Sequence, residues 1–101
     1  NVRSDVLDNV FSALNQNRET LKNLSVKRLG LFGSFARGNP VPSSDIDFLV
    51  ELQKPSFDNF MNLVFYLEKL FGRRVDLITK GNLSTHIKPF VEKEIQWYET
   101  K

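Results

Sequence analysis

The sequence predicts a single α/β (α+β) domain in which a small mixed β-sheet is flanked by helices. Short apolar runs of strand length alternate with longer segments whose apolar residues recur at helical spacing. The chain has 101 residues, of which 41% are hydrophobic and 26% are charged, as in one ordinary soluble domain. We therefore expect residues 1–101 to form one domain with its own core, in the order helix, strand, short helix, strand, helix, strand, helix.

The N-terminal part of the chain is predicted to be helical. Apolar residues between positions 6 and 14 recur at helical spacing, and Ser4 is a candidate N-cap ahead of them. The segment 15–17, with the sequence Asn-Gln-Asn, is expected to interrupt this helix. A second helical piece then carries Leu21 and Leu24 toward the first strand.

Three strands are predicted. The run at 26–32 is apolar and ends sharply at 33–34, a Gly-Ser pair. A loop at 38–43 contains two prolines, which exclude regular structure there. The second strand, 45–52, has acidic residues at its start and a nearly continuous apolar middle, which suits a strand covered on both faces. The third strand is 74–79.

Two helices complete the predicted order. The segment 57–71 has an apolar face at helical spacing, with Ser56 as a candidate N-cap and Gly72 where a C-terminal cap belongs. After a turn at 81–82 we predict a final helix, which admits Pro89 only in its first turn. The apolar face of this last helix would comprise Ile87, Phe90, Val91, Ile95 and Tyr98.

Composition excludes several classes of protein. The chain has no cysteine, so it forms neither disulfides nor thiolate metal sites, which fits a reducing cytoplasm. The net charge of +2 is small and the basic residues are dispersed, so no direct binding of nucleic acid is expected. No apolar run is long enough to span a membrane and no signal-peptide pattern is present, so a cytoplasmic location without membrane association is expected.

The first candidate functional feature is the Gly33-Ser34 turn after the first strand, within the sequence GSFARG. A glycine at such a turn lets the backbone approach a ligand closely, and the unpaired amides that begin the next helix favour an anion. The Ser34 hydroxyl and the nearby Arg37 would then help to hold a phosphate. Plain turn chemistry is the alternative interpretation of this short motif.

The second feature is the pair Asp45 and Asp47. Residues two apart on a strand point to the same face, with Cα atoms about 6.5–7 Å apart. Two such carboxylates suit one divalent metal, or two metals about 3.5–4 Å apart, and Mg²⁺ prefers such hard oxygen ligands. The alternative is a solvated strand end. It is weakened by the apolar residues that follow, since two aspartates at the edge of a core repel each other without a cation.

The third feature is Asp76, a lone aspartate inside the apolar third strand. Such a residue is costly to bury without a partner. Arg73 and Arg74 offer a simple salt-bridge explanation. If the third strand lies beside the second, however, Asp76 completes a carboxylate triad that is able to bind metal and accept the proton of an attacking hydroxyl.

These features together resemble a known superfamily. A Gly-Ser turn, a ten-residue spacer, an Asp-x-Asp strand and a later aspartate on the next strand resemble the DNA polymerase β-like nucleotidyltransferases. The form GSFARG…SDIDFLVE resembles the minimal nucleotidyltransferases within it. The resemblance implies a palm-like mixed sheet and Mg²⁺-dependent transfer of a nucleoside monophosphate, with two ions. Gly33, Ser34 and Arg37 would bind the triphosphate of ATP or another NTP, with a salt bridge as the alternative role of Arg37. Asp45, Asp47 and Asp76 would be the metal ligands and catalytic residues.

The resemblance also implies a partner. Minimal nucleotidyltransferases pair with HEPN-domain proteins in toxin–antitoxin modules, so we expect transfer of AMP to a tyrosine of such a partner. We also expect the chain to form a hetero-oligomer or a homo-oligomer. Two alternatives stay open. One is a nucleotide-binding antitoxin subunit that masks its partner sterically with little or no turnover. The other is a structural domain whose acidic residues have no catalytic role.

Overall fold

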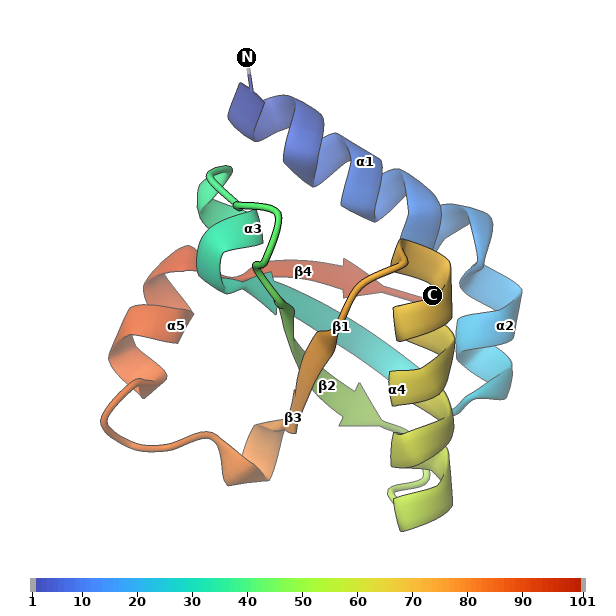
Figure 1. Ribbon diagram of the computed structural model, residues 1–101. Helices are drawn as coiled ribbons and strands as arrows, with labels where there is room; N and C mark the ends of the chain where they lie inside the picture. The colour runs from blue at the N-terminus through green and yellow to red at the C-terminus, as the bar shows by residue number, and fades with distance from the viewer. Residues whose placement is uncertain (1, 101) are drawn as a thin grey trace.

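The computed structural model describes residues 2–100, with side chains described from Asp5 onward. Strands and helices alternate along most of the chain (Figure 1). In order, the elements are α1 (Val2–Gln16), α2 (Arg18–Asn23), β1 (Val26–Phe32), α3 (Gly33–Arg37), β2 (Ile46–Leu52), α4 (Phe57–Phe71), β3 (Val75–Thr79), the 3₁₀ turn η1 (Lys80–Asn82), α5 (Lys88–Glu94) and β4 (Gln96–Glu99).

The strands form one mixed sheet in the order β3-β2-β1-β4, which confirms the predicted fold class. β1 is antiparallel to both of its neighbours, β2 and β4, whereas β2 and β3 are parallel. Parallel neighbours need a crossover connection, and α4 provides it. As predicted, α4 starts after Ser56, whose hydroxyl accepts a hydrogen bond from the Asn59 amide at 3.0 Å, and it ends at Gly72 in a left-handed conformation.

One face of the sheet carries the main core. Side chains that alternate along β1, β2 and β3 pack there against α1, α2 and α4, which Figure 1 shows gathered on one side of the sheet. The largest fully buried side chains of the protein lie in this core: Phe48, Leu14, Leu21, Leu29, Leu31, Ile46, Leu63 and Leu67. Burial of each such side chain contributes about 1.5–3 kcal/mol to the free energy of unfolding.

Among the described helices, none is both long enough and apolar enough to cross a membrane.

The opposite face of the sheet is covered only in part, by α5 (Figure 1). A small second cluster holds α5 in place, because Val91 packs with Phe32 and Leu49, and Ile95 and Trp97 pack around them. The rest of this face is open. It carries the polar side chains from which the candidate site is built.

The N-terminal helices follow the prediction in part. The predicted break near Asn17 is confirmed, since α1 ends at Gln16 and α2 starts at Arg18. The Asn17 side chain stabilises the break, because it donates to the Ala13 carbonyl oxygen at 2.8 Å and accepts a hydrogen bond from the Tyr66 hydroxyl. The prediction that Ser4 caps the first helix is wrong, because α1 already starts at Val2 and Ser4 lies inside it.

The predicted final helix is wrong in its second half. α5 ends at Glu94, and the chain then extends into β4, which pairs with β1. The predicted apolar face is buried only in part, since Val91 is 5% exposed whereas Phe90 is 70% exposed. Gly30 of β1 permits the strand instead, because any side chain there would overlap Ile95. Pro89 does lie in the first turn of α5, as predicted.

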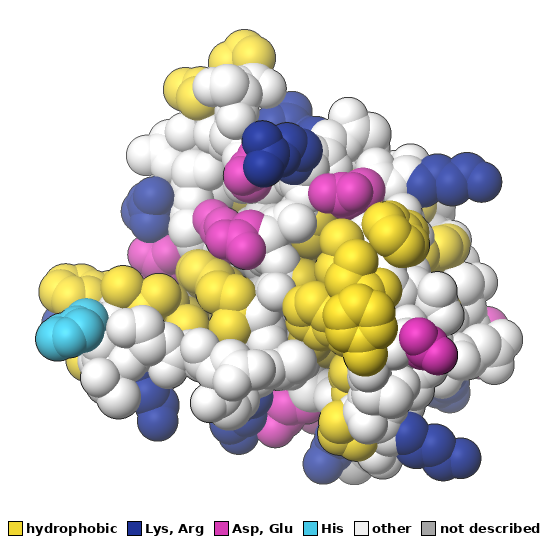
Figure 2. Space-filling model, turned by 60° about the horizontal axis from the view of Figure 1, so that its bottom comes forward, with side chains coloured by type: hydrophobic (Ala, Val, Ile, Leu, Met, Phe, Trp, Pro, Cys, Tyr) yellow, Lys and Arg dark blue, Asp and Glu magenta, His cyan; other side chains and the backbone are white. Residues whose placement is uncertain are grey.

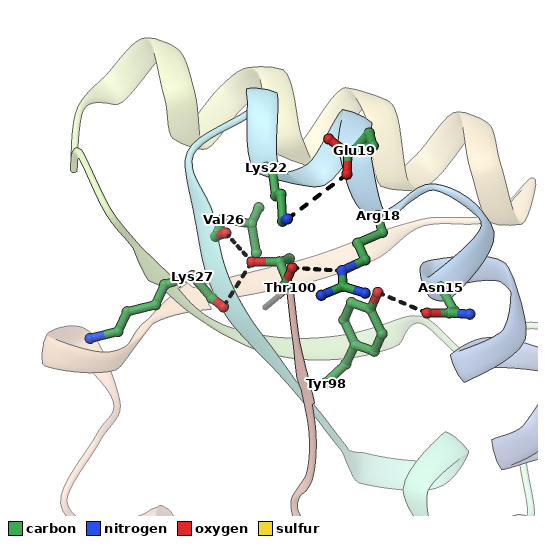
Figure 3. Close-up of polar contacts among 8 residues, drawn as sticks. All are labelled: Asn15, Arg18, Glu19, Lys22, Val26, Lys27, Tyr98 and Thr100. Atoms are coloured by element: carbon green, nitrogen blue, oxygen red, sulfur yellow. Dashed lines mark hydrogen bonds and ion pairs between the residues drawn. The ribbon is translucent and has the colours of Figure 1, made fainter.

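A polar cluster anchors the end of β4 to the start of β1 (Figure 3). Thr100 is buried, and its hydroxyl lies 2.9 Å from the Val26 carbonyl oxygen and 3.2 Å from that of Lys27. Arg18 donates from Nε to the Thr100 carbonyl oxygen at 2.7 Å. β4 is thus fixed at both ends: the cluster under α5 holds its start, and the hydrogen bonds of Thr100 hold its end.

Candidate active site

The open face of the sheet presents its side chains in three cross-strand rows. Each row consists of residues that are register partners on neighbouring strands. The first row contains two aspartates, the second is apolar and the third contains an ion pair. The first row is Phe32, Asp47 and Asp76; the second is Trp97, Gly30, Leu49 and Ile78; the third is Glu99, Arg28 and Glu51.

The Gly33 turn lies next to the acidic row. Gly33 follows Phe32 directly and has a φ of +76°, in the left-handed region where residues with a side chain are strained. Space demands glycine as well, because a methyl group at this position would overlap the Asp47 carboxylate. The predicted turn between strand and short helix is therefore present, and its backbone lies against the second carboxylate of the Asp-x-Asp pair.

The backbones of the three predicted carboxylates lie at one end of the open face. Asp47 and Asp76 are register neighbours on parallel strands, which are about 4.8 Å apart. Asp45 comes two residues before Asp47, just ahead of β2, although the strand was predicted to begin there. The side chains have not converged, since no three His, Cys, Asp or Glu side chains among the described residues form a group able to hold a metal ion.

The charges around Asp47 explain why a cation would be favoured there. Partial burial is the main factor that raises the pKa of Asp47 from 3.8 to about 6, and the charges of Asp76, Asp45 and Glu94 raise it further. Arg37 acts in the opposite direction. Burial and the neighbouring carboxylates together therefore disfavour the ionised form of Asp47, and a cation beside it would offset both effects.

The simple salt-bridge explanation of Asp76 finds no support. Arg73 donates to the Ser44 carbonyl oxygen at 2.9 Å, and its guanidinium lies 4.9 Å from the centre of the Phe35 ring. Within residues 5–100, no lysine or arginine lies within ion-pair distance of Asp45, Asp47 or Asp76.

Glu94 belongs to this region, and the sequence did not indicate it. Its carboxylate accepts a hydrogen bond from the Gly33 amide. The same carboxylate pairs with Arg37 Nη1, at 3.0 Å and 3.2 Å to its two oxygens. The salt bridge that was one option for Arg37 is thus what the structure contains. No local motif marks Glu94, because it comes from the end of α5 and meets the turn only through the fold.

A cavity of about 580 Å³ lies beside the apolar row, beneath α5. It is adjacent to the acidic row, since Leu49 in its wall is two residues along β2 from Asp47. Figure 2 shows acidic side chains beside two groups of hydrophobic side chains on one side of the molecule. The walls of the cavity include Arg28, Leu49, Lys80, Leu83, Lys88 and Trp97.

Comparison with known proteins gives the class of the site. A family model described as a nucleotidyltransferase domain matches residues 14–98. The protein adenylyltransferase MntA of Thermococcus cleftensis is 37% identical over 91 residues, which cover 88% of this chain and 92% of the relative. The chain therefore belongs to the nucleotidyltransferase domain family, as the sequence motifs predicted.

Solved structures agree with this assignment. A chain of a toxin–antitoxin crystal structure with AMP-PNP matches with a TM-score of 0.65 and 25% identity, over 83% of this chain and 72% of that one. A chain in the complex of tri-AMPylated Shewanella oneidensis HEPN toxin with MNT antitoxin shares the fold. Its TM-score is 0.54 at 20% identity, over 81% of this chain and 68% of that one. These findings confirm the predicted resemblance, while the roles of the individual site residues stay predictions.

Proposed function

We propose that the chain transfers AMP from ATP to a hydroxyl group, a tyrosine on a HEPN-domain partner, and thereby acts as the antitoxin of a toxin–antitoxin pair. The observation that carries the proposal is the acidic row, in which Asp47 and Asp76 lie side by side next to the Gly33 turn. Family membership supports the transfer chemistry. The name of the Thermococcus relative supports a protein as the acceptor.

In this proposal the Gly33 turn binds the triphosphate. The Gly33 amide and the Arg37 guanidinium are donors at the same place, as their shared contact with Glu94 demonstrates. Charge-assisted hydrogen bonds of this kind are short and strong with phosphate oxygens. Ser34 follows Gly33 directly, and we assign its hydroxyl to the same phosphates.

Asp45, Asp47 and Asp76 are the proposed ligands for Mg²⁺. The donor set fits, because the carboxylates are hard oxygen ligands and their mutual repulsion favours a cation between them. If bound there, one or two Mg²⁺ ions would stabilise negative charge on the attacking and departing oxygens. The side chains need to rotate toward one another for this, since they are not gathered in the protein alone.

The chain's own residues then position the reaction. The acceptor oxygen attacks the α-phosphorus in line, the bond to the bridging oxygen breaks and pyrophosphate departs. Asp76 accepts the proton of the attacking hydroxyl, because it is the exposed member of the acidic row and lies on an edge strand, where an acceptor has access. The turn at Gly33 holds the departing phosphates at the opposite end of the same row.

The acceptor is proposed to be a separate protein. Among the described elements, α5 covers part of the open face, and Asp76 of the acidic row is exposed, so a partner can reach this row. The two solved complexes are toxin–antitoxin assemblies, one with AMP-PNP and one with a tri-AMPylated HEPN toxin, which supports both the nucleotide and the class of partner.

Transfer of the α-phosphate tests the proposal. The chain is incubated with Mg²⁺ and α-labelled ATP, GTP, CTP or UTP, together with a HEPN-domain protein as the candidate acceptor, and the double variant Asp45→Asn/Asp47→Asn is the control. Label from ATP on the partner, absent with the variant and with Tyr→Phe partners, is the expected result. Metal-dependent ATP binding without transfer would instead support steric masking, and the absence of both would refute the proposal.

A further inference from the structure

Glu94 occupies the two donors that the proposed function gives to the triphosphate. Its carboxylate accepts from the Gly33 amide and pairs with Arg37 through both oxygens. A carboxylate and a phosphate are both anionic acceptors, so they compete for the same N–H groups. Glu94 and a phosphate oxygen of a bound nucleotide therefore compete for the Gly33 amide and for Nη1 of Arg37.

Apart from its contacts with the turn, the surroundings of Glu94 disfavour a negative charge. Glu94 is the last residue of α5, where the helix carbonyls disfavour a negative side chain. It also lies close enough to Asp47 for their charges to interact. Both features oppose an acidic residue here, and the Gly33 amide and Arg37 compensate for them. Because Val91 fixes α5 to the sheet, the carboxylate is held at the turn by the fold.

We infer that Glu94 is an internal competitor of the nucleotide, which holds the Gly33 amide and Arg37 in the free protein and is displaced from both when the triphosphate binds. This inference rests on the proposed function for the location of the triphosphate. It assigns Glu94 the role of lowering nucleotide affinity. Displacement breaks the contact between Glu94 and the turn while α5 stays packed on the sheet through Val91.

Nucleotide affinity tests the inference. Binding of AMP-PNP with Mg²⁺ is measured by calorimetry for the full chain and for the variants Glu94→Gln, Glu94→Ala and Glu92→Gln. Glu92 lies on the same helix, is exposed and has no ion pair within the described part of the chain, so its variant removes the same charge without the contact. We expect both Glu94 variants to bind roughly threefold to tenfold more tightly than the Glu92 variant.

The opposite result would identify Glu94 as a structural support of the turn. Weaker binding in Glu94→Gln, or affinity equal to that of Glu92→Gln, overturns the inference. Circular dichroism of each variant first establishes that it is folded. Should Glu94→Ala not fold, the Gln variant decides, because it retains the size of the side chain and one acceptor oxygen.

A second measurement uses the unmodified protein. The side-chain carboxyl ¹³C signal of Glu94 is followed by NMR during titration with inorganic tripolyphosphate and then with AMP-PNP and Mg²⁺. We expect the Glu94 signal and the Gly33 amide signal to shift together at the same ligand concentration. A Glu94 signal that stays constant while Gly33 shifts refutes displacement. Failure of the proposed function is distinguishable, since Glu94 would then respond to nucleotide although no AMP reaches a partner.

Discussion

Asp47 and Glu51 lie four residues apart on the same strand and the same face of the sheet, yet their surroundings are opposite. Glu51 pairs with Arg28 and with Lys80, the latter at 3.1 Å, and its hydrogen bond from Arg28 lowers its pKa. Burial and neighbouring carboxylates raise the pKa of Asp47 to about 6. A carboxylate is thus paired with two cations at one end of the face, whereas carboxylates outnumber the nearby cations at the other end.

This difference indicates which end of the sheet is built for a ligand. At the Glu51 end, Glu51 pairs with both Arg28 and Lys80, and Arg28 also lies 3.7 Å from the centre of the Trp97 ring. The Asp47 end has carboxylates in excess of nearby cations. Carboxylates with perturbed pKa values are enriched at functional sites, where an ion or substrate balances their charge.

The largest effect is expected from crowding Asp47 with Gly33→Ala. The new methyl group would overlap the Asp47 carboxylate, and the backbone has a positive φ, so we expect a loss of about 2–3 kcal/mol in the free energy of unfolding. Gly72→Ala is the matched control, because Gly72 also has a positive φ but nothing within 4 Å, and it should lose about 1 kcal/mol. Urea unfolding measures both, and equal losses would contradict the contact with Asp47.

Removal of the charge at Asp47 is expected to stabilise the metal-free protein. The folded state binds more protons than the unfolded state between pH 3.8 and about 6, so the wild type loses stability as the pH rises through this range. Asp47→Asn does not titrate and avoids that loss. After discounting for solvent screening of this half-buried group, the gain is on the order of 1 kcal/mol at pH 7.5.

The pH dependence separates this explanation from a general packing effect. Thermal unfolding in the presence of a chelator should give nearly equal stability for the wild type and Asp47→Asn near pH 4. The difference should then grow up to about pH 7. A difference that is constant with pH would show that charge at Asp47 is not its cause.

Addition of Mg²⁺ is expected to stabilise the wild type at neutral pH. At an ion concentration about five times the dissociation constant, a ligand that binds only the folded state adds about 1 kcal/mol. The gain should disappear in Asp47→Asn and persist in Glu51→Gln, since only the first variant alters the acidic row. Differential scanning calorimetry with NaCl at matched ionic strength provides the control, and an equal gain in all three proteins would argue against a site at Asp47.

The smallest effect is expected from Glu51→Gln, with the sign opposite to that of Asp47→Asn. The pKa of Glu51 is lowered in the folded state, so its contribution to stability is present above pH 4.5 and is lost as the pH falls. Because its ion pairs are only partly shielded from water, we expect a loss of a few tenths of a kcal/mol at pH 7. A stabilising effect in urea unfolding would contradict the contrast between the two ends.

The elements that the sequence predicted well are those with local signals. α4 has a capping serine, an apolar face and a terminal glycine, and it was predicted with the correct ends. The segment 95–98 had no such signal, because its apolar residues fit a helical spacing while pairing with β1 makes it a strand. Gly30 was the available clue, since a glycine within an apolar strand often marks close approach of another chain segment.

The candidate site divides in the same way. The spacing of the Gly-Ser turn and the aspartates indicated its location, and the register confirms that Asp47 and Asp76 are neighbours. Glu94 was not predictable, because it meets Gly33 across 61 positions of sequence and only after α5 has packed on the sheet. Side-chain positions around a metal depend on the ion itself, so sequence spacing alone does not give them.

The opposite orientation of neighbouring side chains along β2 also bears on how reliably the sheet assembles. Phe48 faces the main core, while Asp47, Leu49 and Glu51 lie on the other face, where Leu49 is covered by α5. A slip of the strand by one residue would bury the carboxylates and expose the phenylalanine, at a cost far above that of any single contact in the native sheet. The acidic residues proposed for catalysis therefore also protect the chain from misaligned pairing, so neutralising Asp47 should increase the yield of misfolded, aggregation-prone protein during refolding even as it stabilises the native state.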